Sequence, residues 1–223
     1  MPQRRSELKG IHALYRAQPE QHSGGLQMHY ALLGDIHSSK EDLEKVLADI
    51  SEKCPAAVHV GTGDLFECII SKKDITNQKF TKLKDVMIIP EGFTELLTFL
   101  SVSGNQEDRI LMITETDNPL REKLDMMPES IDIFTAKIIH GHQWEWGGEP
   151  WALIHADVDE SPVFYGHSHA SKLSRNNVNE TIKFGIPYDV SGDKVLVNVG
   201  AVIIEREWLL YDSLANTVTF MKA

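Results

Sequence analysis

The chain has 223 residues, of which 42% are hydrophobic, so it can form one domain with a sizeable core. Its formal net charge of -11 and its lack of any run of five Lys or Arg argue against a module that binds duplex nucleic acid or anionic membranes. No apolar stretch is long enough to span a bilayer, and Cys54 and Cys68 form no CxxC pair, so we expect reduced thiols in a cytoplasmic protein.

Residues 1–27 are polar and basic and lack the apolar segment of a secretory signal. A Gly-Gly pair at 24–25 can be encoded by a purine run that resembles a bacterial ribosome-binding sequence, so Met28 is a candidate start and residues 1–27 a candidate translated leader. The alternative is a genuine N-terminal helix, because three apolar residues between positions 8 and 14 recur at near-helical spacing. We therefore expect an N-terminal extension, 1–27, followed by one domain, 28–223.

The front of this domain reads as a strand–helix–strand unit. His29–Leu33 is a short apolar run that predicts a buried strand ending at Gly34-Asp35. A helix is expected to begin at Ser38, where Glu41 completes a capping box. One face of that helix is apolar, at Leu43, Val46, Leu47 and Ile50. Ala56–Val60 predicts the next strand, and a unit of this length is a parallel crossover.

The middle and the end of the chain differ in character. Residues 72–84 are polar and basic and predict an exposed loop or insertion. Further strands are expected at Leu100–Ser103, Ile131–Ile139 and Pro162–Tyr165, and helices at Phe93–Phe99, Asn118–Met127 and Pro150–Ala156. The last third predicts alternating strands at 171–177, 181–190, 194–203 and 207–221. Together these elements indicate two sheets packed face to face with helices outside.

Five of the expected strands end in a short turn that contains glycine and a metal-ligand side chain. The turns are Gly34-Asp35-Ile36-His37, Gly63-Asp64, Gly104-Asn105, His140-Gly141-His142 and Gly166-His167-Ser168-His169. Ligands of α/β sheets bind outside the carboxyl ends of the parallel strands, so one edge would collect two aspartates, an asparagine and four or five histidines. Glycine beside each ligand permits tight turns and close backbone approach. Each turn alone is a weak signal, and the ordered set predicts a metal centre.

The mixture of carboxylate, amide and imidazole groups suits a pair of divalent cations. Two cations about 3.5–4 Å apart repel each other and need a shared anion, which one aspartate can supply. Neutral imidazoles and an amide oxygen complete the coordination without cancelling the Lewis acidity. Such mixed shells suit Mn, Fe, Co, Ni or Zn better than Mg or Ca. The cation pair can also lower the pKa of a bridging water, so that hydroxide forms near neutral pH.

The order of these motifs resembles the calcineurin-like metallophosphoesterase family. It is most similar to the small bacterial and archaeal phosphodiesterases, which are related to a subunit of eukaryotic retromer. The resemblance covers residues 28–223 and implies an α/β fold, a four-layer αββα sandwich of two mixed sheets flanked by helices. It departs from the family at 197–201, Val-Asn-Val-Gly-Ala, where Asn-Pro-Gly-Ser is usual. The ligands that it implies are Asp35, His37 and His169 for the first metal, Asn105, His140 and His167 for the second, and Asp64 as the bridge.

The resemblance implies a two-metal phosphoesterase that hydrolyses a phosphodiester or phosphomonoester by attack of a metal-bridging hydroxide. Manganese is the expected metal, with Fe, Zn, Ni and Co as alternatives. The expected partner is a small phosphate-ester substrate, with nucleotides among the candidates. Two other interpretations stay open. One is a catalytically weak scaffold that acts in protein interaction, and the other is a nucleotide or dinucleoside polyphosphate hydrolase.

The proton donor to the leaving group is the main departure from the family. Many members follow Gly-Asn with a histidine in this role, whereas this chain has Gln106 and then Glu107. Glutamine cannot act as a general acid, so we expect a bias towards good leaving groups such as aryl or nucleotidyl phosphates. We expect Asn105 both to bind metal and to contact the phosphate. His142 is a candidate proton donor, or a histidine that supports a ligand or faces the substrate.

Other residues near the turns have two interpretations. Trp144, Trp146 and Trp151 flank the His140 turn and could form an aromatic wall for a nucleobase, or pack beneath the loop. Glu67 follows the second Gly-Asp turn, where an acidic residue would help to orient a ligand.

Overall fold

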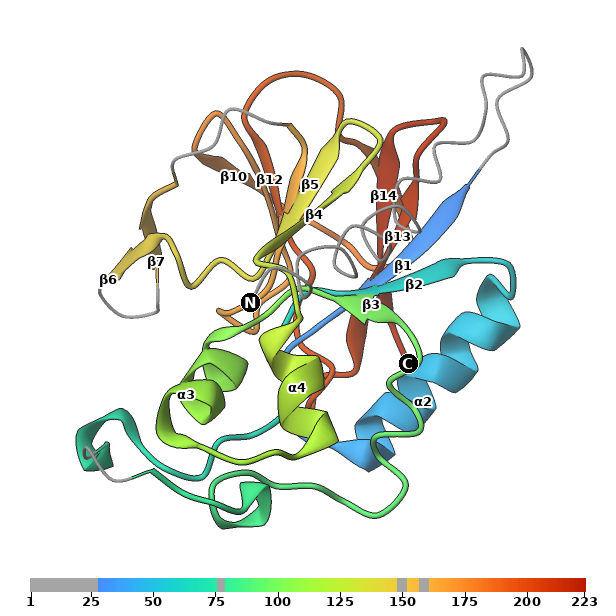
Figure 1. Ribbon diagram of the computed structural model, residues 1–223. Coiled ribbons are helices and arrows are strands. Elements are labelled where there is room, and N and C mark those ends of the chain that lie inside the picture. The colour runs from blue at the N-terminus through green and yellow to red at the C-terminus, as the bar shows by residue number, and fades with distance from the viewer. Residues whose placement is uncertain (1–27, 76–78, 148–151, 157–160) are drawn as a thin grey trace, which may run out of the picture.

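The first of two large sheets contains the chain's first strands and its C-terminal end. The computed structural model describes residues 28–75, 79–147, 152–156 and 161–223 (Figure 1), and the N-terminal extension and Trp151 lie outside this part. The strand order is β11-β14-β13-β1-β2-β3. Its members are β1 (His29–Leu33), β2 (Val58–Gly61), β3 (Leu100–Ser101), β11 (Pro187–Asp189), β13 (Glu207–Asp212) and β14 (Thr217–Lys222). Strands β1, β2 and β3 run parallel, so their carboxyl ends meet at one edge.

The second sheet has the order β10-β9-β12-β8-β5-β4. Its members are β4 (Ser130–Ile133), β5 (Ala136–Ile139), β8 (Val163–Tyr165), β9 (Lys172–Arg175), β10 (Val178–Glu180) and β12 (Val195–Asn198). Strand β8 pairs in parallel with β5 and β12, and the outer strands pair antiparallel. Both sheets are therefore mixed, and each brings parallel strand ends to an edge.

The helices lie on the side of the first sheet that faces away from the second (Figure 1). They are α2 (Lys40–Lys53), α3 (Asn105–Ile113) and α4 (Pro119–Asp125), with short 3-10 turns η1 (Lys72–Asp74) and η2 (Leu83–Asp85) below them. Within the described residues, no helix is long and apolar enough to span a bilayer.

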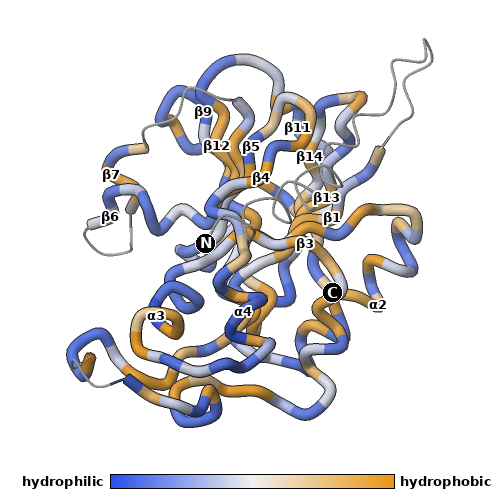
Figure 2. The backbone as a smooth tube through the Cα atoms, in the orientation of Figure 1, coloured by the Kyte–Doolittle hydropathy of each residue, from blue (hydrophilic) through white to orange (hydrophobic). Residues whose placement is uncertain are grey.

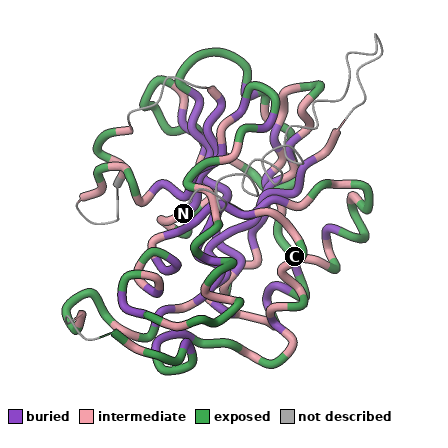
Figure 3. Tube along the Cα trace, viewed as in Figure 1, coloured by how far each residue is buried: buried purple, intermediate pink, exposed green. Residues whose placement is uncertain are grey.

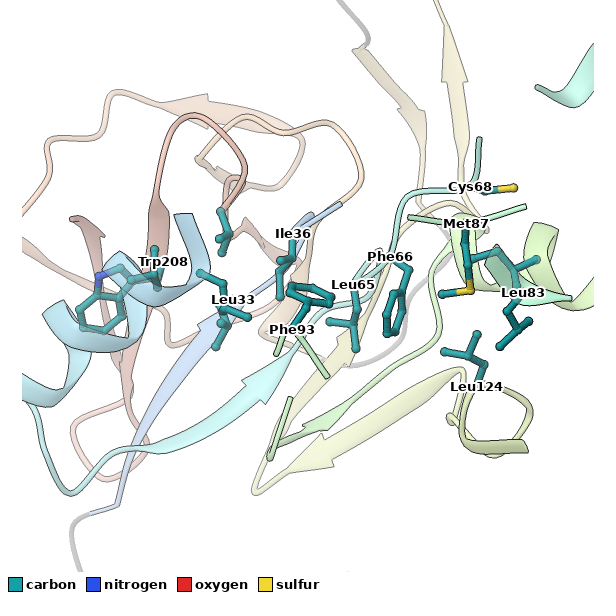
Figure 4. Close-up of a cluster of buried hydrophobic side chains, with 14 of the residues drawn as sticks. Leu33, Ile36, Leu65, Phe66, Cys68, Leu83, Met87, Phe93, Leu124 and Trp208 are labelled. Atoms are coloured by element: carbon teal, nitrogen blue, oxygen red, sulfur yellow. The ribbon is translucent and has the colours of Figure 1, made fainter. Parts of the chain in front are cut away.

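The alternation of side chains along β1 divides the core into two parts. Ala31 and Leu33 face the helices and pack with Leu43, Val46 and Ile50 of α2, as the predicted apolar face requires. The neighbouring Tyr30 and Leu32 point to the other side and pack between the sheets. Apolar and buried residues accordingly concentrate along the strands in Figures 2 and 3, and Figure 4 shows the helix-side cluster from Trp208 to Cys68 and Leu124.

A hairpin covers the outer face of the second sheet. Strands β6 (Glu145–Gly147) and β7 (Ala152–His155) pair antiparallel, and Trp144, Trp146 and Leu153 pack on Tyr165 and its neighbours in the sheet. The predicted α/β class with two mixed sheets is confirmed. In the described part of the chain, the layer outside the second sheet is this hairpin rather than a helix.

Three sequence-based expectations about single elements were wrong. The expected strand Ile131–Ile139 is a hairpin, β4 and β5, because Phe134 takes a left-handed turn with φ 54°. The expected helix Phe93–Phe99 forms turns only, and the described residues of the expected helix Pro150–Ala156 include strand β7. Patterns of four or five apolar residues do not separate a short helix from a strand or a packed loop.

The start of α2 and the presence of α3 also differ from expectation. Helix α2 begins at Lys40 with Ser39 as its N-cap residue, because Ser38 is left-handed and its hydroxyl donates to the carbonyl of Ile88. Helix α3 was not predicted, and it begins at the candidate ligand Asn105. The described residues of 72–84, which are 72–75 and 79–84, are mostly exposed as expected, but Leu83 is buried in the core.

Candidate metal centre

The turns after β1, β2, β3, β5 and β8 lie together where the carboxyl ends of the two sheets meet. They bring the seven predicted ligands into one place: Asp35, His37, Asp64, Asn105, His140, His167 and His169. The side chains form two groups that could each hold an ion. One group is Asp35, His37 and His169, and the other is Asp64, His140 and His167, with the candidate ligand atoms of each group within 4.8 Å of one another.

The first group contains two imidazoles that face each other. The Nε2 atoms of His37 and His169 are 3.0 Å apart. Oδ1 of Asp35 lies 3.3 Å from Nε2 of His169 and 3.9 Å from Nε2 of His37. Asp35 is fully buried, and its carboxylate also accepts a hydrogen bond from the backbone N–H of His167. Two imidazole nitrogens and a carboxylate oxygen therefore surround one small volume.

Asn105 completes the second group. Nε2 of His140 lies 3.3 Å from Oδ2 of Asp64 and 3.2 Å from Oδ1 of Asn105. The rings of His140 and His167 are edge to face, with centroids 5.1 Å apart. His140 is fully buried, whereas Asn105 and His167 reach the surface of a cleft.

Asp64 lies between the two groups. Its Oδ2 atom is 3.3 Å from Nε2 of His140 in one group and 3.7 Å from Nε2 of His37 in the other. Its second oxygen, Oδ1, accepts the backbone N–H of Gln106 at 2.9 Å, which fixes the rotation of the carboxylate. One oxygen of this side chain therefore faces both groups at once.

Hydrogen bonds to the far side of two imidazoles set their orientation. Nδ1–H of His140 donates to the carbonyl of Thr62 at 2.8 Å. Nδ1–H of His37 donates to Oε2 of Glu67 at 2.6 Å, as the position of Glu67 after its turn suggested. When either ring is neutral, its lone pair is then on Nε2, which faces the centre.

The backbone is strained at five of the candidate ligands. Their φ angles are positive, a region that residues other than glycine rarely enter: Asp35 50°, His37 47°, Asp64 50°, His167 69° and His169 58°. Such conformations cost about 1–3 kcal/mol each and persist only where the surroundings impose them. Here the amides of Asp35 and His37 donate to the carbonyls of Gly63 and Asp64, so the first two turns hold each other.

Close backbone approach explains the glycine before Asn105. A Cβ atom on Gly104 would overlap the backbone nitrogen and the Oδ1 atom of Asp64. The φ of Gly104 is −108°, so space rather than backbone freedom requires glycine at this position.

Glu107 is the buried residue that sequence reasoning missed. It is fully buried, and its carboxylate accepts the backbone N–H groups of Asp64, Phe66 and Gly104 at 2.9–3.0 Å. Burial and the nearby Asp64 raise the pKa of Glu107 to about 7. Glu107 is the third residue of α3, where an acidic side chain often caps a helix, so its spacing from Gly104 was the available signal.

The electrostatics of the centre favour a bound cation. Burial opposes protonation of His140, but Asp64 and Asp35 raise its pKa to about 9. Burial would raise the pKa of Asp64, yet His140 lowers it to about 2. Burial and His140 together lower the pKa of His167 to about 4. The buried carboxylates that raise the pKa of His140 would also attract a divalent cation. The donor set therefore fits metal ions.

Gln106, at the family's usual proton-donor position, and His142, the candidate donor, each have a hydrogen-bond partner. Oε1 of the buried Gln106 accepts the backbone N–H of Cys68 at 3.2 Å. Nε2 of His142 is 3.0 Å from Oδ2 of Asp108, whose other oxygen accepts the hydroxyl of Ser103. The ring of His142 lies beside those of the second group but does not line the cleft.

A cleft of about 490 Å³ opens over the two groups. Its lining comprises His37, Asp64, Glu67, Lys72, Asn105, Gln106, Arg109, His167, His169 and Ile203. Trp144 and Trp146 do not line it. They pack against Tyr165 under the hairpin, and the indole of Trp146 also donates to the carbonyl of Gly141. Of the two interpretations, the structure favours packing for these two tryptophans.

Comparison with known proteins identifies the family. No curated protein matches the chain. The fold is similar to that of a metallophosphoesterase from Sphaerobacter thermophilus, with 19% identity, a TM-score of 0.64 and coverage of 89% of this chain and 88% of the other. It is also similar to a "putative diadenosine tetraphosphatase", with 14% identity, a TM-score of 0.50 and coverage of 89% and 95%. The model of the calcineurin-like phosphoesterase superfamily domain matches residues 28–210. The chain belongs to this family of metal-dependent phosphoesterases.

Proposed function

We propose that this phosphoesterase works with two divalent cations. Asp35, His37 and His169 would hold the first, and Asn105, His140 and His167 the second, with Asp64 between them. The observation that carries the proposal is the position of Oδ2 of Asp64, 3.3 Å from an imidazole of one group and 3.7 Å from an imidazole of the other. A shared carboxylate is what two neighbouring cations need.

The donor set supports manganese as the metal, with Fe, Zn, Ni and Co as alternatives, because nitrogen and oxygen donors are mixed. Two such cations, when bound, supply Lewis acidity towards a phosphate oxygen and a hydroxide nucleophile near neutral pH. The chain's own residues do the positioning. Asn105 lines the cleft with its Oδ1 turned towards His140, so its amide nitrogen is available to donate to a phosphate oxygen.

The proposed substrate is a small phosphodiester or phosphomonoester with a good leaving group. Gln106 has no acidic proton, and its oxygen is occupied by Cys68. His142 remains a proposed proton donor, positioned by Asp108, and because it does not line the cleft we expect it to serve only leaving groups at the edge. A non-catalytic scaffold gains no support from the geometry, because a scaffold has no need for seven converging metal ligands.

Substitution of the shared carboxylate tests the two-metal proposal. Asp64→Asn should abolish manganese-dependent hydrolysis of bis-p-nitrophenyl phosphate and lower the metal content of the purified protein from two ions per chain. His169→Ala should remove one ion and leave one. The matched control is Asp132→Asn, which changes an exposed aspartate on β4 and should alter neither readout. Two ions per chain and full activity in the Asp64 variant would refute the proposal.

A further inference from the structure

The cleft contains two cationic side chains in addition to the candidate metal ligands. Lys72 of η1 and Arg109 of α3 line the same cleft as Asn105 and His167. Arg109 lies four residues after Asn105 on one helix, so the two side chains share a face about one helical turn, or 5.4 Å, apart. A positive charge is thus placed beside the metal centre in a chain whose net charge is -11.

Arg109 has few strong partners among the described residues. Its Nε atom is buried without a hydrogen-bond partner, its hydrogen bond from Nη1 to the carbonyl of Ile70 is long at 3.4 Å, and its guanidinium also interacts with the thiol of Cys68, a weak acceptor. By contrast, Arg175 makes three hydrogen bonds, Arg121 makes two, and Arg206 pairs with Asp42 at 2.8 Å. A buried donor without a partner calls for an explanation, and arginine's planar fork matches a phosphate group.

The position of Arg109 also bears on the missing proton donor. A leaving group that departs as an alkoxide needs a proton, which Gln106 cannot give. A leaving group that departs as a phosphate has a second pKa of about 6 and leaves without one. A guanidinium beside the metal centre would stabilise the negative charge that develops on such a phosphate. Arg109 and Gln106 therefore indicate the same kind of substrate.

We propose that Arg109, assisted by Lys72, binds a second phosphate next to the one at the metal centre, and that the preferred substrates are phosphoanhydrides. This inference rests on the proposed function. In the reaction, the oxygen of water forms a bond to the phosphorus at the metal centre, and the bond from that phosphorus to the bridging oxygen breaks. The electron pair stays on the departing phosphate, which Arg109 holds, and the protons of water are released to solvent or to the products.

Kinetics with two classes of substrate test the inference. The single-phosphate probe is bis-p-nitrophenyl phosphate. The anhydride probes are inorganic pyrophosphate, in which the two phosphates are free, and ADP and diadenosine tetraphosphate, in which a nucleoside carries them. Arg109→Gln should lower kcat/KM for at least one anhydride about 10²-fold, as loss of a charge-stabilising donor does. Its effect on kcat/KM for the single-phosphate probe should be smaller by a factor of about ten or more. Arg109→Lys should keep part of the preference, because it keeps charge but not the fork.

The matched control for Lys72→Gln is Lys73→Gln, which changes the next residue of the same turn and does not line the cleft. Lys72→Gln should weaken the anhydride preference, and Lys73→Gln should not. A binding readout is independent of turnover. In calorimetry on the manganese-loaded protein, methylenebisphosphonate should bind roughly tenfold or more tightly than methylphosphonate, and Arg109→Gln should remove that difference.

The outcomes distinguish this inference from the proposed function. Failure of the manganese-loaded protein to cleave any probe would overturn the proposed function. Cleavage of bis-p-nitrophenyl phosphate with equal losses for both substrate classes in Arg109→Gln would overturn only the inference. Equal affinity of the wild-type protein for the two phosphonates would also overturn it, even if the Arg109 variants failed to fold. A lowered melting temperature without a change in substrate preference would give Arg109 a structural role.

Discussion

Glu107 offers the sharpest test of how the centre is held together. Its carboxylate is fully buried and accepts three backbone N–H groups, from Asp64, Phe66 and Gly104. Oε2 accepts two of them and Oε1 the third. These bonds join the turn after β2 to the turn after β3, so Glu107 fixes the shared carboxylate of Asp64 relative to Asn105. We expect its loss to reduce both stability and metal binding.

The magnitude follows from the number of amides left without an acceptor. In Glu107→Gln, the side-chain oxygen can replace one carboxylate oxygen, and the NH₂ group then faces at least one backbone N–H. One unsatisfied buried amide costs about 1–3 kcal/mol. Glu107→Ala leaves all three amides without a partner. If each costs an amount near the low end of that range, the free energy of unfolding should fall by about 3–5 kcal/mol. The ordering, alanine worse than glutamine, is part of the prediction.

Urea unfolding of the metal-free protein measures the first effect, and calorimetric titration with manganese measures the second. The matched control is Glu122→Gln on the exposed side of α4, expected to change stability by less than about 0.5 kcal/mol. If Glu107→Gln were as stable as the control and bound manganese with wild-type affinity, the three hydrogen bonds would not hold the centre, and this reasoning would be wrong.

Three further predictions concern stability, steric fit and proton donation. Burial raises the pKa of Asp42, but hydrogen bonds from Ile204, Arg206 and Ser39 outweigh burial and lower this pKa below 3.8. The ionised Asp42 carboxylate therefore stabilises the fold above about pH 4, and this stabilisation is lost as pH falls through the folded-state pKa. Asp42→Asn should cost about 1–3 kcal/mol at pH 7, and the difference in unfolding free energy from wild type should shrink in acid; a constant difference would contradict this. Gly104→Ala should lower the free energy of unfolding by at least about 1–3 kcal/mol and abolish metal binding. The control Gly185→Ala, at φ 76° with no atom within 4 Å of the added Cβ, should lower it by about 1 kcal/mol and leave the metal content unchanged. Similar metal contents in the two variants would argue against the overlap with Asp64. His142→Asn should lower kcat for alkyl phosphate esters about 10²-fold, because their leaving groups need a proton, and should change kcat for p-nitrophenyl esters little. Equal losses of kcat for both kinds of ester would mean that His142 supports the site and does not donate the proton.

The convergence of the seven candidate ligands could be predicted from the sequence because the end of each strand is visible in the local sequence, and the ends of parallel strands lie together in the fold. Gly34-Asp35 and Gly63-Asp64 each follow a run of apolar residues, and parallel strands place their carboxyl ends at one edge. The same reasoning located the strand before His167. It needed only the direction of the strands and no knowledge of side-chain packing.

What the sequence could not provide depends on contacts between distant segments. Arg109 and Lys72 are 37 positions apart, and nothing local indicates that they share a cleft. The left-handed turn at Phe134 splits an apolar run into two strands, although a bulky aromatic residue is unusual in that conformation. Trp146 belongs to a hairpin that covers a sheet face, and its packing partners could not be known before the second sheet was placed.

From the strained turns and the hydrogen bonds around them, we expect the turns to be in place before metal binds. Five candidate ligands have positive φ, and this strain must be offset by the contacts around them. Those contacts are visible: Glu107 accepts three amides from the turns, Thr62 holds His140, and the raised pKa of His140 keeps a positive charge beside Asp64. Because none of these interactions needs a metal, ions would enter a prepared site and displace a proton rather than organise the fold. Metal affinity should accordingly weaken as pH falls, with the turns remaining in place.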